Sequence, residues 1–90
     1  FTDLERKICN DKINPPIHYS GKFAAKEAVK KALLSAKIIT SITFRSIEII
    51  NDGSGVPLIN LKIDKIKFND IKVSISHAGE YATASAIVVI

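Results

Sequence analysis

The chain has 90 residues and a formal net charge of +4, with 47% hydrophobic and 24% charged residues. This length allows one domain at most, and the composition is typical of a globular protein and excludes intrinsic disorder. No apolar run is long enough to cross a bilayer, and the one cysteine, Cys9, excludes a disulfide within the chain. We therefore expect a cytoplasmic protein without a membrane segment.

The first predicted element is a short helix at residues 3–12. Its residues are mostly polar, which indicates that the helix is exposed. Asn14-Pro15-Pro16 is expected to end it, because proline lacks an N–H and disfavours helix in the residue before it. We interpret Cys9 as an ordinary helix residue and His18 as a structural one, since the sequence shows no partner for either.

The central predicted element is a long helix that includes residues 21–33 and runs to about Lys37. Ala, Leu, Lys and Glu are strong helix formers, and Ser20 stands where an N-cap would accept a hydrogen bond from the first turn. The apolar residues recur at three- and four-residue spacing on one side; they are Ala25, Ala28, Val29, Ala32 and Leu33. Because this side is mostly alanine, we expect the helix to lie close to its partner.

A first strand pair is predicted after the helix. Residues 41–50 are rich in Ile, Thr and Phe, and residues 56–61 form the return strand. Asn51-Asp52-Gly53-Ser54-Gly55 between them is a strong turn signal. Residues 63–69 are ambiguous and are interpreted as a short helical turn or an irregular connection.

A second strand pair is predicted near the end. Residues 71–75 alternate apolar and polar side chains, residues 78–80 form a turn, and residues 81–90 return. One side of the return strand carries small residues that could seat a helix; they are Ala82, Ala84 and Ala86. We therefore predict an α+β fold, with an antiparallel sheet packed against one long helix.

Lysines are concentrated on the predicted long helix. The lysines there are Lys22, Lys26, Lys30, Lys31 and Lys37. Such a face favours anionic partners, although a solvated lysine face is the commonest outcome of this pattern. Aromatic residues among the lysines are scarce and no nucleic-acid-binding motif is present. A nucleotide cofactor together with an acidic protein is an alternative partner set.

Glu27 and Lys31 lie one turn apart on the same side of the predicted helix. A carboxylate and an ammonium at this spacing could hold a metal ion and a phosphate side by side. They could also form a surface ion pair worth about 0.2–0.5 kcal/mol, which is the commoner case.

Several stretches of the chain are motifs that together resemble one known family; they are Phe1-Thr2-Asp3-Leu4-Glu5, Gly21-Lys22-Phe23-Ala24-Ala25-Lys26-Glu27-Ala28, Ser46-Ile47-Glu48-Ile49, Ser54-Gly55-Val56-Pro57, Val73-Ser74-Ile75-Ser76-His77 and Glu80-Tyr81-Ala82. In order and spacing they resemble the holo-acyl carrier protein synthases, the small members of the 4′-phosphopantetheinyl transferase superfamily. Each motif alone is weak, but together they cover nearly the whole chain.

The resemblance implies an enzyme of fatty acid biosynthesis with the phosphopantetheinyl transferase fold. Such an enzyme moves the 4′-phosphopantetheine group of coenzyme A to a serine of an apo-acyl carrier protein. The serine hydroxyl attacks the β-phosphate, so the reaction needs a divalent cation, cationic side chains and a base. The resemblance also implies Mg²⁺ as cofactor, an acidic carrier protein as partner and a homotrimer, with neither nucleic acid nor a membrane as partner.

The resemblance assigns roles to individual residues. Glu27 matches the metal-binding glutamate of the family, Lys31 a lysine on the coenzyme A phosphates, and His77 a histidine near the 3′-phosphate. These three are the predicted catalytic residues, and Gly55 and Pro57 match the turn that lines the adenine pocket. The full set of predicted coenzyme A contacts is Lys22, Lys31, Gly55, Pro57, Ser76 and His77.

The chain departs from the family pattern in three places. Lys22 stands where arginine is common, which keeps the charge but loses the bidentate fork. Residues 34–40 contain no glycine where the family has a glycine-rich turn, which affects how this loop would meet the cofactor. The family's other metal ligand, an aspartate on a first strand, has no match, since Asp3 belongs to the next segment. We therefore expect residues 1–90 to be a single domain that is incomplete at its N-terminus.

Two other functions stay open from the sequence. One is a non-catalytic relative that binds a carrier protein or forms a trimer. The other is a basic domain that binds a nucleotide or nucleic acid, which steeply salt-dependent binding to a random duplex would reveal.

Overall fold

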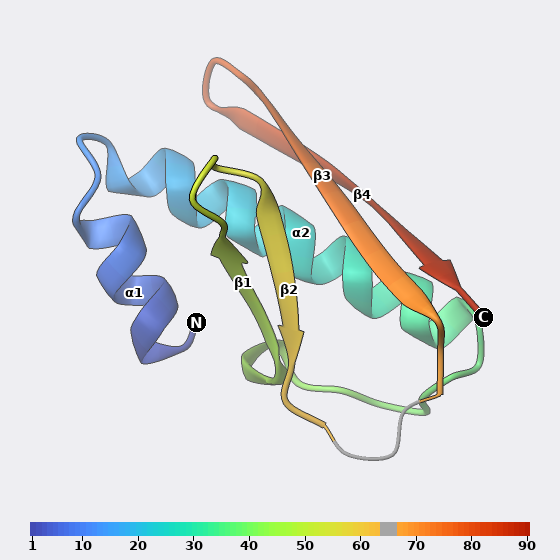
Figure 1. Cartoon of the computed structure of the whole chain (residues 1–90). Coiled ribbons are helices and arrows are strands. Elements are labelled where there is room, and N and C mark those ends of the chain that lie inside the picture. The colour runs from blue at the N-terminus through green and yellow to red at the C-terminus, as the bar shows by residue number, and fades with distance from the viewer. Residues whose placement is uncertain (64–66) are drawn as a thin grey trace.

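The computed structural model describes residues 1–63 and 67–90. Its elements are α1 (Asp3–Asn10), α2 (Pro15–Ser35), the 3₁₀ turn η1 (Phe44–Ser46), β1 (Ile47–Asn51), β2 (Pro57–Leu61), β3 (Asp70–Ala78) and β4 (Tyr81–Val89). β1 pairs with β2 and β3 pairs with β4, both antiparallel, and α2 runs beside both pairs (Figure 1). This arrangement confirms the predicted α+β class. No helix within these two segments has the length and hydropathy of a membrane span.

The hydrophobic core lies between α2 and the strands. Ala25, Val29 and Leu33 of α2 are fully buried in one cluster with Ile47 and Ile49 of β1. Small side chains of β4 pack against this cluster; they are Ala84 and Ala86. The predicted contact between the helix stripe and the small residues of the strand is therefore confirmed in part, since Ala28, Ala32 and Ala82 lie outside the core cluster.

α2 begins at Pro15, so the prediction that Ser20 caps this helix was wrong. Pro15 and Pro16 occupy its first two positions, where proline has a suitable φ and lacks only an N–H that would have no partner in the helix. Ser20 lies inside the helix instead. α1 already ends at Asn10, so the two prolines start the second helix rather than end the first.

α1 is fixed at its N-terminus by a capping box. The Thr2 hydroxyl accepts from the Glu5 N–H at 3.2 Å, and the Thr2 N–H donates to Glu5 Oε1 at 2.8 Å. The predicted short helix is confirmed, but one side of it is not exposed: Glu5 and Cys9 are fully buried.

Glu5 and Lys26 form a buried ion pair between α1 and α2. Glu5 Oε1 lies 2.7 Å from Lys26 Nζ, and the two side chains are 0% and 1% exposed. Lys26 Nζ also donates to the Phe44 carbonyl at 2.7 Å, and Glu5 Oε2 accepts from the Ile49 N–H at 2.8 Å. Lys22 is buried as well. The alternative of a solvated lysine face is therefore wrong for Lys22 and Lys26, which join elements of the fold.

The first strand pair is shorter than predicted. β1 starts at Ile47 rather than at residue 41, because Phe44–Ser46 form η1. The predicted turn after β1 is confirmed: the Asp52 carboxylate accepts from the Ser54 N–H at 2.8 Å and from the Val56 N–H at 3.0 Å. Gly55 in this turn has a φ of 87°, which residues with a side chain rarely adopt.

The second strand pair is confirmed. β3 and β4 are joined by the turn Gly79-Glu80 and pair in continuous register from Ala78 opposite Tyr81. Gly79 has a φ of 62°, as two-residue hairpin turns commonly require. The prediction for residues 63–69 falls partly on residues 64–66, which lie outside the described residues.

α2 ends at Ser35 in a Schellman motif whose left-handed residue is Lys37. The Ile38 N–H donates to the Leu33 carbonyl and the Lys37 N–H to the Leu34 carbonyl, each at 3.1 Å. Lys37 has a φ of 58°. The turn therefore keeps a geometry that favours glycine, although the sequence has no glycine there.

Lys37→Gly should raise the free energy of unfolding by about 1 kcal/mol. Glycine would remove a left-handed conformation that costs other residues about 1–2 kcal/mol, partly offset by the greater freedom of the unfolded chain. Urea unfolding followed by circular dichroism measures the change. Ser35→Gly, inside the last turn of α2, is the matched control and should lower the free energy of unfolding by about 0.5 kcal/mol. Equal effects of the two substitutions would contradict this account.

Candidate functional site

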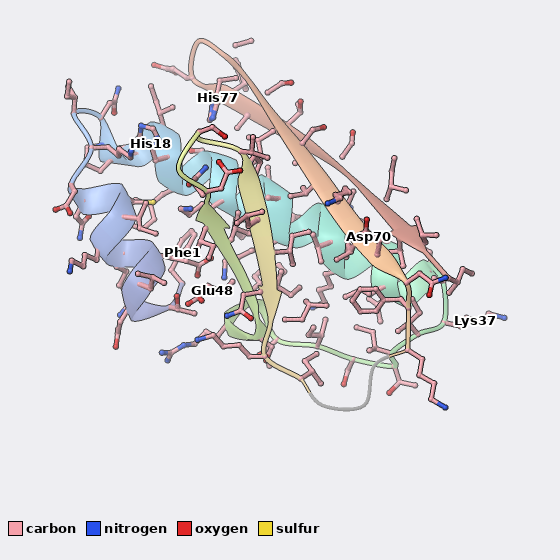
Figure 2. All side chains as sticks on the ribbon, in the orientation of Figure 1. Phe1, His18, Lys37, Glu48, Asp70 and His77 are labelled. Atoms are coloured by element: carbon pink, nitrogen blue, oxygen red, sulfur yellow. The ribbon has the colours of Figure 1, made fainter. Side chains whose placement is uncertain are left out.

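A cavity of about 260 Å³ opens where α1, the first turns of α2, the β1–β2 hairpin and the end of β3 meet. Lysine and histidine side chains from several elements line it; they are Lys12 after α1, His18 and Lys22 on α2, and His77 on β3. His18 and His77 lie near each other at this end of the molecule (Figure 2). Among the described residues no carboxylate lines the cavity, so its charge favours an anion.

Lys22 is held against the edge of β1. Its ammonium donates to the Ile49 carbonyl at 2.6 Å and to Asn51 Oδ1 at 3.4 Å. Burial lowers the pKa of Lys22, and Cys9 and Glu5 nearby oppose that change. An anion in the cavity would favour the charged form, so Lys22 is placed to bind one.

His77 lies against α2 at Gly21. Strand alternation puts His77 on the same face of β3 as Ile75, which packs toward the core, and puts Ser76 on the opposite face. A Cβ on Gly21 would lie 2.9 Å from His77 Cε1 and 3.3 Å from Ile75 Cγ2. Glycine at position 21 therefore makes room for the imidazole beside the helix.

His18 lies one helical turn before Gly21 and Lys22 and shares their side of α2. Burial lowers the pKa of His18, and the positive charges of Lys12, His77 and Lys22 lower it further. Negative charge in the cavity would oppose this repulsion and favour the protonated imidazole.

Glu27 and Lys31 are not among the residues that line this cavity. Helix geometry places Glu27 about 140° around the axis from Lys22. Glu27 is half-buried and Lys31 is exposed. The ion pair that the sequence allowed between them is not formed in the described part of the chain. The described residues also contain no group of three His, Cys, Asp or Glu side chains placed to hold a metal ion.

The structure brings some of the predicted site residues together and leaves others apart. Those at the cavity are Lys22, Gly55, Pro57 and His77. Those outside it are Glu27, Lys31 and Ser76. The role of each residue stays a prediction.

Sequence reasoning missed Lys12, His18 and Gly21 as cavity residues. His18 was interpreted as structural, although it lines the cavity. The available signal was spacing: once α2 is known to begin at Pro15, His18, Gly21 and Lys22 fall at i, i+3 and i+4 on one helix face. Lys12 had no such signal, because its position depends on the path between α1 and α2.

Residues 1–86 match the family model described as "4'-phosphopantetheinyl transferase superfamily" (ACPS). The chain belongs to this superfamily. The holo-[acyl-carrier-protein] synthase of Chlamydia pneumoniae is 40% identical to it over 89 residues, which cover 97% of this chain and 72% of that protein. The protein of the same name from Caldanaerobacter subterraneus subsp. tengcongensis is 40% identical over 96 residues, which cover 99% of this chain and 73% of that protein.

Solved structures agree with this membership in the 4′-phosphopantetheinyl transferase superfamily. The Helicobacter pylori holo-[acyl-carrier-protein] synthase in complex with coenzyme A is 33% identical, with a TM-score of 0.79, and the match covers 98% of this chain and 76% of that one. The Chronobacterium ammoniagenes ACPS–CoA complex is 30% identical with a TM-score of 0.82 and the same coverage. The resemblance identified from the sequence motifs is therefore confirmed.

Gly21→Ala should leave this transferase-superfamily chain folded but displace the His77 imidazole. The new Cβ would lie 2.9 Å from His77 Cε1, and the exposed end of the His77 side chain can move away from it. The better helix propensity of alanine offsets the lost contact, so the free energy of unfolding should change by less than about 1 kcal/mol.

Imidazole NMR spectra at fixed pH measure this displacement. The His77 signals should shift in Gly21→Ala and stay unchanged in Ser20→Ala, a neighbouring exposed position that serves as the control. Unchanged His77 signals in folded Gly21→Ala would show that the imidazole does not lie on this helix face.

Proposed function

We propose that this chain uses the cation-lined cavity to transfer the 4′-phosphopantetheine group of coenzyme A to a serine of an apo-acyl carrier protein. The serine hydroxyl gives its proton to a base and its oxygen bonds to the β-phosphorus. The bond from that phosphorus to the bridging oxygen breaks, and 3′,5′-adenosine diphosphate leaves with the bridging oxygen. The activity predicted from the sequence is confirmed at the level of enzyme class by the family match and by the relatives of 40% identity. The single observation that carries the proposal for this site is the convergence of Lys22, His77, Gly55 and Pro57 at one cavity.

The cavity suits the nucleotide end of coenzyme A. Lys22 supplies positive charge and His77 a ring N–H donor for a phosphate group, and a fixed cation in a partly water-excluded site stabilises an anion more than it would in water. Gly55 and Pro57 lie at the hairpin that forms one wall, where the resemblance places the adenine. Coenzyme A is present in both of the similar solved complexes, which supports coenzyme A as the substrate here.

Glu27 is the proposed Mg²⁺ ligand of this chain. Its carboxylate is half-buried on α2 and forms no ion pair in the described residues, so it is available to a cation. One such carboxylate fits Mg²⁺, which prefers one or two carboxylates with waters and phosphate oxygens. When bound, the ion would polarise a phosphate oxygen as a Lewis acid. Lys31, one turn later on the same side of α2, is proposed to contact the phosphates.

Glu27→Gln should lower the turnover number by orders of magnitude while leaving the fold intact. Glutamine has nearly the same shape and helix propensity, so the free energy of unfolding should change by no more than about 0.5 kcal/mol. The loss of a metal ligand removes transition-state stabilisation worth several kcal/mol. Transfer of labelled phosphopantetheine to an apo-carrier protein, titrated with Mg²⁺, measures the effect.

Lys31→Ala is the matched comparison for Glu27→Gln. It should mainly raise the KM for coenzyme A, because Lys31 is proposed to contact phosphate in the ground state and in the transition state. Normal turnover and an unchanged Mg²⁺ requirement in folded Glu27→Gln would refute the role of Glu27. If wild type binds a carrier protein but transfers nothing, the chain is the non-catalytic relative that the sequence left open.

The active form is proposed to be a homotrimer with its sites at subunit boundaries. Glu27 and Lys31 lie on a different side of α2 from the cavity, and a neighbouring copy could bring the two groups onto one coenzyme A. A chain of 90 residues also gains from burial between copies. Large apolar side chains on the hairpin are available for this; Tyr81 and Ile87 are 78% and 67% exposed.

Sedimentation equilibrium should report a trimer at micromolar concentration. Ile87→Glu, which places a charge on the exposed apolar face, should shift the protein to monomer and lower transfer activity. Lys7→Glu, on the exposed side of α1, is the control and should leave the trimer intact. A wild-type monomer with full activity would disprove the assembly.

An acidic acyl carrier protein is the proposed macromolecular partner. The formal net charge of +4 supports it, but the predicted docking face must change, because Lys26 is buried. Lys30 Nζ lies 5.0 Å from the centre of the Phe44 ring and is also engaged within the chain. Exposed basic side chains such as Arg6, Lys7 and Arg45 remain for docking. A cytoplasmic role in fatty acid biosynthesis completes the proposal.

A further inference from the structure

We propose that Lys12 and His18 join Lys22 and His77 in one phosphomonoester site, and that His18 takes up a proton when the phosphomonoester binds. This inference rests on the proposed function, because the phosphomonoester it commits to is the 3′-phosphate of coenzyme A. Its consequence is that the affinity for coenzyme A falls as pH rises through the neutral range.

The geometry brings the four groups to one place. His18 and Lys22 are four residues apart on one side of α2, and the His77 imidazole lies against Gly21 between them. Lys12 reaches the same cavity from the connection between α1 and α2. Figure 2 shows His18 on α2 and His77 on β3 at the same end of the molecule.

The charges around His18 are all positive or absent. Lys12 faces it from the connection after α1, Lys22 from α2 and His77 from β3. The β1–β2 hairpin contributes only uncharged lining residues; they are Ile49, Asn51, Gly55 and Pro57. Like charges gathered without a counter-charge repel one another, and a dianion is the ligand that best relieves this repulsion.

The basic side chains at the cavity differ in whether they already have partners within the chain. Lys22 donates to the Ile49 carbonyl at 2.6 Å. Lys12 and His18, in contrast, form neither a side-chain hydrogen bond of this kind nor an ion pair within the described residues. These two groups are therefore free to bind a ligand, whereas Lys22 holds its charge in a fixed place.

His18 is the group expected to change its charge. Burial lowers the pKa of His18, and the neighbouring Lys12, His77 and Lys22 lower it further, so the free protein favours the neutral imidazole. A bound dianion opposes the cations and raises the pKa of His18 again. The complex then binds more protons than the free protein near neutral pH, so the Kd for the ligand rises with pH. If binding raises the pKa of His18 by one unit, the Kd can change with pH by at most about tenfold.

Isothermal titration calorimetry of the full chain at about pH 6.5 and about pH 8.0 tests the inference. Repeating each titration in two buffers that differ in ionisation enthalpy gives the number of protons taken up on binding. Over this range the phosphomonoester, whose second pKa is about 6, stays mostly dianionic. Wild type should bind coenzyme A about three- to tenfold more tightly at the lower pH and take up a fraction of a proton. 3′-Dephospho-coenzyme A should bind more weakly at both pH values, with little pH dependence.

Three variants separate the contributions. His18→Gln should remove most of the pH dependence and proton uptake and leave the Kd at about pH 8.0 within about twofold, because the imidazole is neutral there. Lys12→Gln should weaken coenzyme A binding at both pH values, by about fivefold or less for an exposed charge. Lys67→Gln removes a matched exposed charge outside the cavity and should change neither value.

The outcomes distinguish this inference from the proposed function. Wild-type binding without pH dependence, or full proton uptake in His18→Gln, would overturn the inference and leave the proposed transfer standing. No binding of coenzyme A by folded wild type would overturn the proposed function and the inference together. Inorganic phosphate is the third probe: if it shows the pH dependence while coenzyme A and the dephospho form bind alike, the cavity does not hold the 3′-phosphate.

Discussion

The buried ion pair between Glu5 and Lys26 is the interaction on which the rest of the structure depends. Both groups are almost fully removed from water, which is costly unless their remaining hydrogen-bonding capacity is satisfied. It is satisfied here by the Thr2 N–H, the Ile49 N–H and the Phe44 carbonyl. One carboxylate thus joins α1 to α2 and to β1, and loss of one partner would leave a buried charge at a cost of about 3–5 kcal/mol.

This pair also determines where the cavity can form. Lys22 lies one turn before Lys26 on α2, so the helix rotation that brings Lys26 to Glu5 also brings Lys22 to the Ile49 carbonyl. The same rotation turns Gly21 toward β3, where the His77 imidazole lies. It leaves Glu27 on another side, away from the cavity. The separation of the predicted site residues into two groups is therefore a consequence of how the core fixes α2.

The pattern of neighbouring residues predicted much of this fold, because strands, turns and helix faces depend largely on the preferences of residues close in sequence. The alternation in β3 and the turn at residues 51–55 follow from preferences of nearby residues, and both are confirmed. The apolar stripe of α2 is confirmed for Ala25, Val29 and Leu33. The failures need information from elsewhere in the chain. Lys26 reads as a surface lysine unless its partner Glu5 is known, and it is 1% exposed. The resemblance supplied Lys22, Gly55, Pro57 and His77, which meet at one cavity. His18 could be found only by its spacing from Lys22 once the start of α2 is known, and Lys12 had no signal in the sequence.

The hydrogen bonds of Ile49 have a consequence for self-association. Its N–H and carbonyl point away from β2 and are taken by Glu5 and Lys22, at 2.8 Å and 2.6 Å. An exposed strand edge normally offers such groups to a strand of another molecule, which is a common route to aggregation. At Ile49 two charged side chains occupy the positions that a foreign strand would need. The same ionised groups that hold the helices in place therefore also protect the edge of β1 from intermolecular β-sheet formation.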